Sequence, residues 1–315
     1  MSETPHPWKA LLQSGRFASF ETRDGARIRY AAWQPEGAVR GTVVFLNGRT
    51  EFIEKYLETI ADLLARGFAV WTKDWRGQGL STRPLGNPRK GHARAFEPLL
   101  GDLQDFLTEI VRPNSVGPYL ALAHSMGGHL TLRTLAEHPG FFSGAVLSAP
   151  MVAIQTLGWP RLVVEGLAEL ATQFGFEEHY VPGMGDADPY QTGFVGNILT
   201  SDPDRFRQMQ IWTKENPALG LGGPTYGWMR AAFRSMRKMD DPDYVRAMDV
   251  PVLFLSAGEE RIVRNDAQER LSQRLPQGQF VSLAGARHEI LLERDPIRAR
   301  FWEAFDGFTK AGPLT

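Results

Sequence analysis

Short apolar runs alternate with segments in which apolar residues recur every three or four positions. The runs at 42–46, 68–72, 119–123 and 144–148 predict buried strands, because a strand covered on both faces is apolar at every position. The segments between them, at 52–66, 96–111 and 126–138, have the spacing of amphipathic helices. This alternation predicts a mostly parallel sheet flanked by helices, an α/β fold.

The same pattern can be followed towards both ends of the chain. Two strands are predicted at 17–22 and 27–33, separated by the hairpin signal Asp24-Gly25. Strands at 251–256 and 279–283 alternate with helices at 265–275 and 296–308. The region between is richer in glycine, proline and aromatic residues, and its amphipathic pieces lie at 161–174, 204–215 and 226–239. We therefore predict an α/β core made of residues 1–150 and 251–315, with a helical cap of residues 151–250 inserted in it.

Composition narrows the function classes. The 315 residues carry a net charge of −1, which gives no general attraction to nucleic acid. The absence of cysteine excludes disulfides, thiolate metal sites and a cysteine nucleophile. No apolar run approaches the roughly 18 residues of a membrane span, and the first residues lack the apolar stretch of a secretory signal. We expect a cytoplasmic protein, and the sequence does not indicate an oligomeric state.

A serine stands at the junction between a predicted strand and a predicted helix. The junction reads Ala123-His124-Ser125-Met126-Gly127. A serine on such a sharp turn projects its hydroxyl out of the sheet, as the nucleophile of a hydrolase does. The alternative is a tight turn in which Ser125 only caps the helix.

A serine nucleophile needs a base and an acid that orients the base. Loops at the carboxyl ends of parallel strands line the ligand crevice, and His288 follows the last predicted strand. We predict His288 as the base. The loop after residues 251–256 supplies the acid; Glu260 is favoured, with Glu259 and Asp266 as alternatives.

The tetrahedral intermediate of ester hydrolysis needs two backbone donors. The N–H of Met126, directly after the nucleophile, is one candidate. The N–H of Arg49, which follows Gly48 in the loop after residues 42–46, is the other. This chemistry needs no cofactor or metal, and no zinc-type cluster of histidines is evident.

The cap offers candidate substrate contacts. Trp159, Trp212 and Trp228 are predicted, together with Gly48, to line the seam between cap and core, although residues at helical spacing also serve for packing. Four basic residues share part of one predicted helix: Arg230, Arg234, Arg237 and Lys238. They form either a solvated face or a patch that attracts an anionic lipid surface, which would bring the cap into peripheral contact with a membrane.

With these motifs the chain resembles the serine-hydrolase branch of the α/β-hydrolase superfamily, close to monoacylglycerol lipases and bacterial lysophospholipases. The matching segments are residues 47–51, 74–81, 123–128 and 258–263 and His288. Asn47 replaces the usual histidine of the oxyanion loop, and Glu260 replaces the usual aspartate. The resemblance implies a serine ester hydrolase acting on monoacyl lipids.

Three alternatives stay open. A small-molecule carboxylesterase or an iminopeptidase would use the same fold and the same triad. An iminopeptidase also needs a carboxylate that holds the substrate amine, and the cap offers Glu165, Glu177, Glu178 and Glu215. A non-catalytic ligand receptor of this fold is a more distant alternative, which the presence of His288 disfavours.

Overall fold

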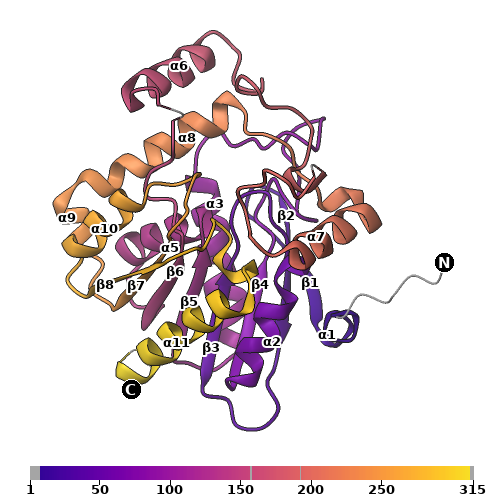
Figure 1. Ribbon diagram of the computed structural model, residues 1–315, viewed down its shortest axis with the longest axis vertical. Coiled ribbons are helices and arrows are strands. Elements are labelled where there is room, and N and C mark those ends of the chain that lie inside the picture. The colour runs from indigo at the N-terminus through magenta and orange to yellow at the C-terminus, as the bar shows by residue number, and fades with distance from the viewer. Residues whose placement is uncertain (1–7, 157, 192, 313–315) are drawn as a thin grey trace.

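Eight strands form one sheet at the centre of the computed structural model, which describes residues 8–156, 158–191 and 193–312 (Figure 1). The strands are β1 (Arg16–Glu21), β2 (Arg27–Trp33), β3 (Gly41–Leu46), β4 (Phe68–Lys73), β5 (Tyr119–His124), β6 (Gly144–Ser148), β7 (Val252–Ala257) and β8 (Gly278–Leu283). Their order is β1-β2-β4-β3-β5-β6-β7-β8. Strand β2 runs antiparallel to both its neighbours, and the other pairs are parallel. The predicted mostly parallel sheet is confirmed.

Helices cover both faces of this sheet (Figure 1). They are α1 (Lys9–Ser14), α2 (Leu57–Ala65), α3 (Glu97–Asp105), α4 (Arg112–Asn114), α5 (Met126–Glu137), α10 (Asn265–Arg274) and α11 (Asp295–Ala311). Helices α2 and α11 lie side by side on one face, where Arg66 pairs with Asp306 at 2.8 Å. Helices α3, α5 and α10 lie on the other face. Strands β3, β4, β6 and β7 are buried at every position, which explains why their sequences are mostly apolar.

Some boundaries differ from the prediction. The segment predicted as one helix at 52–66 begins with a 3-10 turn, Ile53–Tyr56. The helix predicted to end before Pro113 continues to Asn114 after a π-helical turn, Phe106–Val111. That turn interrupts the regular hydrogen-bond ladder just before Pro113, so the missing proline N–H is tolerated. Helix α1 was not predicted.

The segment between β6 and β7 lies over one end of the sheet (Figure 1). Its helices are α6 (Arg161–Gln173), α7 (Pro203–Glu215), α8 (Tyr226–Met236) and α9 (Pro242–Arg246), joined by the 3-10 turns Pro189–Gln191, Pro217–Leu219 and Arg237–Asp240. Within its described residues no strand occurs, although isolated bridges such as Tyr180 with Thr225 are present. We keep the name cap for residues 151–250; its limits stay a prediction. No helix among the described residues is long and apolar enough to span a membrane.

Candidate active site

Ser125 stands on a strained turn between β5 and α5. Its φ of 49° and ψ of −114° lie outside the regions that non-glycine residues favour. The turn is held by the Ser125 N–H, which donates to the carbonyl of Ser148 at 3.0 Å. A side chain at position 127 would place its Cβ 2.2 Å from the Leu46 carbonyl oxygen, so Gly127 is required for the helix to approach β3. This is the geometry of a nucleophile elbow.

The predicted triad residues come together at this turn. The Nε2 atom of His288 lies 3.0 Å from the Ser125 hydroxyl, and its Nδ1 atom lies 2.7 Å from Glu260 Oε2. The other oxygen of Glu260 accepts the backbone N–H groups of Ile262 at 2.7 Å and Val263 at 3.2 Å. Glu260 is thereby fixed at a distance suited to hold the imidazole of His288.

The two alternative acids lie elsewhere. Glu259 is exposed, and its backbone N–H donates to the carbonyl of Ala286. The carboxylate of Asp266 pairs with Arg264 at 2.6 Å and Arg270 at 2.8 Å on the surface. Of the three predicted acids, Glu260 is therefore the one that contacts His288.

The charges around His288 favour its protonated form. Burial alone lowers the pKa of His288, but the charge and hydrogen bond of Glu260, with the charges of Glu289 and Glu51, outweigh it and raise the pKa above its ordinary value. For Glu260 the signs are reversed. Burial raises its pKa, but His288 and the backbone donors lower it by more, so the pKa lies below its ordinary value. An imidazolium formed during proton transfer is therefore stabilised where it arises.

The oxyanion side is formed by the loop after β3 and the start of α5. A Cβ at Gly48 would lie 3.1 Å from the Ser125 Cβ, so this loop passes directly beside the nucleophile. The Gly48 N–H donates to Glu51, and the Thr50 N–H points to Gln78 Oε1 at 3.3 Å.

Two further N–H groups remain as candidate donors. The N–H of Arg49 lies between the two engaged ones. Met126 is the first residue of α5, so its N–H has no acceptor within the helix.

A buried charged network, which was not predicted, lies behind the triad. Lys55 Nζ lies 2.7 Å from Glu51 and 2.6 Å from Glu289, the residue after His288. Tyr56 donates to Glu51 at 2.9 Å, and Tyr190 of the cap donates to Glu289. The network joins the oxyanion loop, the His288 loop and the cap. The sequence indicates only one of these contacts, because Glu51 and Lys55 are four residues apart, a spacing at which oppositely charged side chains pair on a helix.

His124 also lies beside the triad. Its ring centroid is 4.8 Å from that of His288. Its Nδ1 lies 3.0 Å from the carbonyl oxygen of Ser148. Burial, followed by the charge of His288, lowers the pKa of His124 to about 3, so its ring is neutral.

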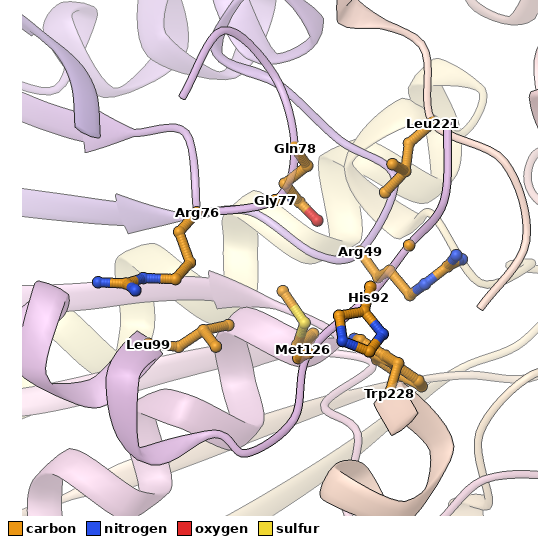
Figure 2. A pocket seen from close by; sticks show the side chains of 11 residues that line it. Arg49, Arg76, Gly77, Gln78, His92, Leu99, Met126, Leu221 and Trp228 are labelled. Atoms are coloured by element: carbon orange, nitrogen blue, oxygen red, sulfur yellow. The ribbon is translucent and has the colours of Figure 1, made fainter. Parts of the chain in front are cut away.

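The three predicted tryptophans occupy different environments. Trp228, on α8, lines a small cavity beside Met126 (Figure 2). Trp212 is buried in the core cluster. Trp159 is 63% exposed at the start of α6 and is not among the residues that line this cavity.

The predicted basic face of the cap is largely paired. Arg234 lies 2.7 Å from Glu169, Arg237 lies 2.9 Å from Glu165, and Lys238 lies 3.3 Å from Glu137. Arg230 is 4.0 Å from the same Glu169. These ion pairs neutralise the cations, so the structure gives little support to a free basic patch.

The carboxylates considered for an iminopeptidase are mostly paired as well. Glu165 also lies 2.5 Å from Arg161, and Glu177 lies 2.7 Å from Arg94. Glu178 is 4.0 Å from Arg94, and Glu215 is exposed at the end of α7. Within the described ranges, no group of three or more histidine, aspartate or glutamate side chains could hold a metal ion.

Comparisons with known proteins agree with this geometry. The family model Hydrolase_4, described as serine aminopeptidase S33, matches residues 37–295. The chain belongs to this family. It is 32% identical to lysophospholipase L2 of Escherichia coli K12, over 90% of this chain and 84% of the relative. It is 31% identical to a monoacylglycerol lipase of Mycolicibacterium smegmatis, over 78% of this chain and 79% of the relative.

Solved structures share the fold. A soluble variant of monoglyceride lipase from Saccharomyces cerevisiae superposes with a TM-score of 0.75 at 20% identity, covering 97% of this chain and 99% of that one. A carboxyl esterase from Bacillus coagulans gives 0.74 at 18% identity, covering 95% and 99%. At these identities the likeness concerns the fold, which confirms the α/β-hydrolase prediction.

Proposed function

We propose that this protein is a serine ester hydrolase that cleaves monoacyl lipids through an acyl-enzyme. The observation that carries the proposal is the chain of contacts from Ser125 through His288 to Glu260, at 3.0 and 2.7 Å. The substrate class comes from the relatives, which are named lysophospholipase and monoacylglycerol lipase.

In the proposed mechanism, the Ser125 hydroxyl attacks the ester carbonyl while His288 Nε2 takes its proton. Glu260 holds the ring through Nδ1 and stabilises the imidazolium. The N–H groups of Met126 and Arg49 donate to the oxyanion. His288 then protonates the leaving alcohol and activates a water molecule, which releases the fatty acid and restores Ser125.

We also propose that the cap contacts lipid surfaces through α6 from the cytoplasmic side. One face of α6 packs on α8, with Ala168 and Glu165 buried. The other face exposes large apolar residues: Leu162, Val163, Leu167, Leu170 and, just after the helix, Phe174. An apolar helix face of this kind suits insertion into the lipid headgroup region. This contact replaces the basic patch as the basis for peripheral membrane contact.

Covalent labelling and a substrate panel test the proposal. A fluorophosphonate probe is expected to label the wild type and not Ser125→Ala. Hydrolysis rates on lysophospholipids, monoacylglycerols, p-nitrophenyl esters and aminoacyl anilides then assign the substrate.

Chain length provides a second test. Each buried methylene contributes about 0.8 kcal/mol, so kcat/KM is expected to rise at least about tenfold over a few added carbons. A flat profile from acetate to decanoate esters would favour the small-ester alternative, and preferred cleavage of aminoacyl anilides would favour the iminopeptidase.

A further inference from the structure

Arg49 carries a largely buried positive charge without an acidic partner. Its Nη1 donates to Thr50 Oγ1 at 2.9 Å, its Nη2 donates to the Gly222 carbonyl at 2.6 Å, and the guanidinium lies 5.3 Å from the centroid of the Trp228 ring. Among the residues that the structure describes, no carboxylate lies within 4.0 Å of it. Its Nε is buried and has no hydrogen-bond partner. Burial, only partly offset by Tyr180 and Asp188, lowers the pKa of Arg49 to about 10, so it stays charged at neutral pH.

A buried charge without a counter-ion is costly to maintain. Lys55 illustrates the usual arrangement, because two carboxylates contact it. The contrast suggests that the counter-ion of Arg49 comes from outside the chain, with the substrate.

His92 faces the same cavity with a second unused polar atom. The cavity is lined by Arg49, His92, Met126 and Trp228 among others (Figure 2). His92 Nδ1 lies 2.9 Å from Thr225 Oγ1, whereas its buried Nε2 has no partner. The Thr225 hydroxyl oxygen accepts the N–H of Trp228 at 3.2 Å, and its single proton can go to Nδ1 at 2.9 Å or to the Gly91 carbonyl at 3.4 Å. The shorter contact favours donation to Nδ1, which leaves the ring proton on Nε2, where it can be donated to an acceptor in the cavity. The volume is about 10 Å³, which is room for one water-sized group.

We propose that Arg49 and His92 form a subsite for the phosphate of a lysophospholipid head group. This inference rests on the proposed function and makes it more specific. The backbone N–H of Arg49 is a proposed oxyanion donor, and its side chain leads from there to the cavity. The ester carbonyl carbon of a lysophospholipid is separated from its phosphorus by the same number of covalent bonds as the Arg49 nitrogen is from its guanidinium carbon. An ester held at Ser125 can therefore bring its phosphate to the guanidinium.

The small volume of the cavity limits how much of the phosphate can enter it. One phosphate oxygen fits between Arg49 and His92, and the rest of the phosphate requires the adjoining cap segment, residues 220–223, to shift. That segment contains three glycines, at positions 220, 222 and 223. A monoacylglycerol has no phosphate and gains nothing from this subsite, so the subsite distinguishes the two substrate classes.

Arg83 offers a matched control. It also joins core to cap through backbone carbonyls, with Nη2 bonded to Gly79 at 2.9 Å and to Ala218 at 2.7 Å. Burial lowers the pKa of Arg83 to about 10 as well. It is not among the residues that line the cavity. Arg83 also donates to the carbonyl of Gly77, which lines the cavity, at 2.9 Å. Arg83→Gln therefore reproduces the loss of a core-to-cap contact while it leaves the side chains of Arg49 and His92 in place.

The test compares kcat/KM for 1-palmitoyl lysophosphatidylethanolamine and 1-palmitoylglycerol, which share one acyl chain. The ratio compared is kcat/KM for the lysophospholipid divided by kcat/KM for the monoacylglycerol. Arg49→Gln is expected to lower this ratio at least about tenfold, because a charge-assisted bond to phosphate is lost. His92→Gln is expected to lower the ratio by less, and Arg83→Gln to leave it unchanged. Arg49→Lys keeps the charge and is expected to retain part of the preference.

Several outcomes would overturn the subsite. In one, Arg49→Gln lowers both values equally, as a loss of folding or of a cap contact would; a melting curve recorded for each variant identifies that case. In another, inorganic phosphate inhibits 1-palmitoylglycerol hydrolysis, Arg49→Gln relieves the inhibition, and the ratio is unchanged, which would make the site one for free phosphate. A wild type that cleaves neither lipid would instead refute the proposed function.

Discussion

The core around Ser125 and the cap differ in which side chains they bury and which they expose. In the core, Glu260, His288 and Lys55 are buried, and each has a specific partner. In the cap, α6 turns apolar side chains outward, with Leu162 80% exposed and Phe174 75% exposed. We therefore expect the core to determine the reaction chemistry and the cap to determine how substrate reaches it.

Several contacts join these regions near the site, and two of them involve groups beside the triad. Tyr190 of the cap donates to Glu289 beside His288, and Arg49 of the core donates to Gly222 of the cap. Changes within the core should therefore affect every substrate, whereas changes confined to the cap surface should affect only substrates presented in lipid.

The largest effect is expected for Ser125→Ala. Loss of a triad nucleophile lowers kcat by about 10⁶ in comparable enzymes. Because the hydroxyl lies at the site and not in the packed core, the melting temperature should change little. Turnover of p-nitrophenyl esters and a melting curve check both points. Retention of a tenth of the wild-type activity would refute the role of Ser125.

Glu260→Gln should lower kcat by about 10²–10⁴, because the side chain keeps its shape and loses the charge that stabilises imidazolium. The matched control is Glu259→Gln, which alters the exposed neighbour and should change little. The same esterase assay measures both variants. The opposite ranking would transfer the role to Glu259, and two silent variants would point to Asp266.

Lys55→Met should destabilise the core by about 3–5 kcal/mol, because two buried carboxylates lose their shared cation. Lys73 is the matched control. It is also fully buried, but its Nζ has no hydrogen-bond partner, and burial lowers its pKa to about 7. Lys73→Met should therefore cost much less. Denaturant unfolding of both variants gives the two values, and equal values would mean that the network around Lys55 is not what stabilises this side of the site.

Much of the fold could be predicted from the sequence because the buried parallel strands form short, mostly apolar runs. Strands β2 and β6 lie where the pattern placed them, and Ser125 and His288 follow strands whose ends converge. Local pattern could not reveal contacts between distant segments. The pairing of Lys55 with Glu289 joins residues 234 positions apart. Arg234 and Arg237 looked like a free basic face because their acidic partners lie on α6.

Glu289→Gln should shift the acid limb of the pH profile to lower pH. His288 acts as a base only when neutral, so activity falls as the pH drops through its pKa. The negative charge of Glu289 contributes to the raised pKa of His288, and its removal should lower that pKa. Glu293→Gln, which alters another buried carboxylate of this loop, is the control. A profile of kcat/KM against pH measures the shift; an unchanged limb in Glu289→Gln would contradict the proposed influence of the network on the triad.

The smallest effect is expected from the cap surface. The double variant Leu162→Ser with Phe174→Ser removes two of the most exposed apolar side chains near α6, so binding to phospholipid vesicles should weaken several-fold because less apolar area enters the lipid. Val116→Ser, at an exposed apolar position on the core, is the control. Because the cations of α8 are paired with carboxylates, anionic and zwitterionic vesicles should bind about equally well. Cosedimentation measures binding, and hydrolysis of p-nitrophenyl acetate in solution should stay unchanged in the double variant. If binding is unaffected, or if it depends mainly on anionic lipid, α6 is not the contact and the charged residues of α8 must be reconsidered.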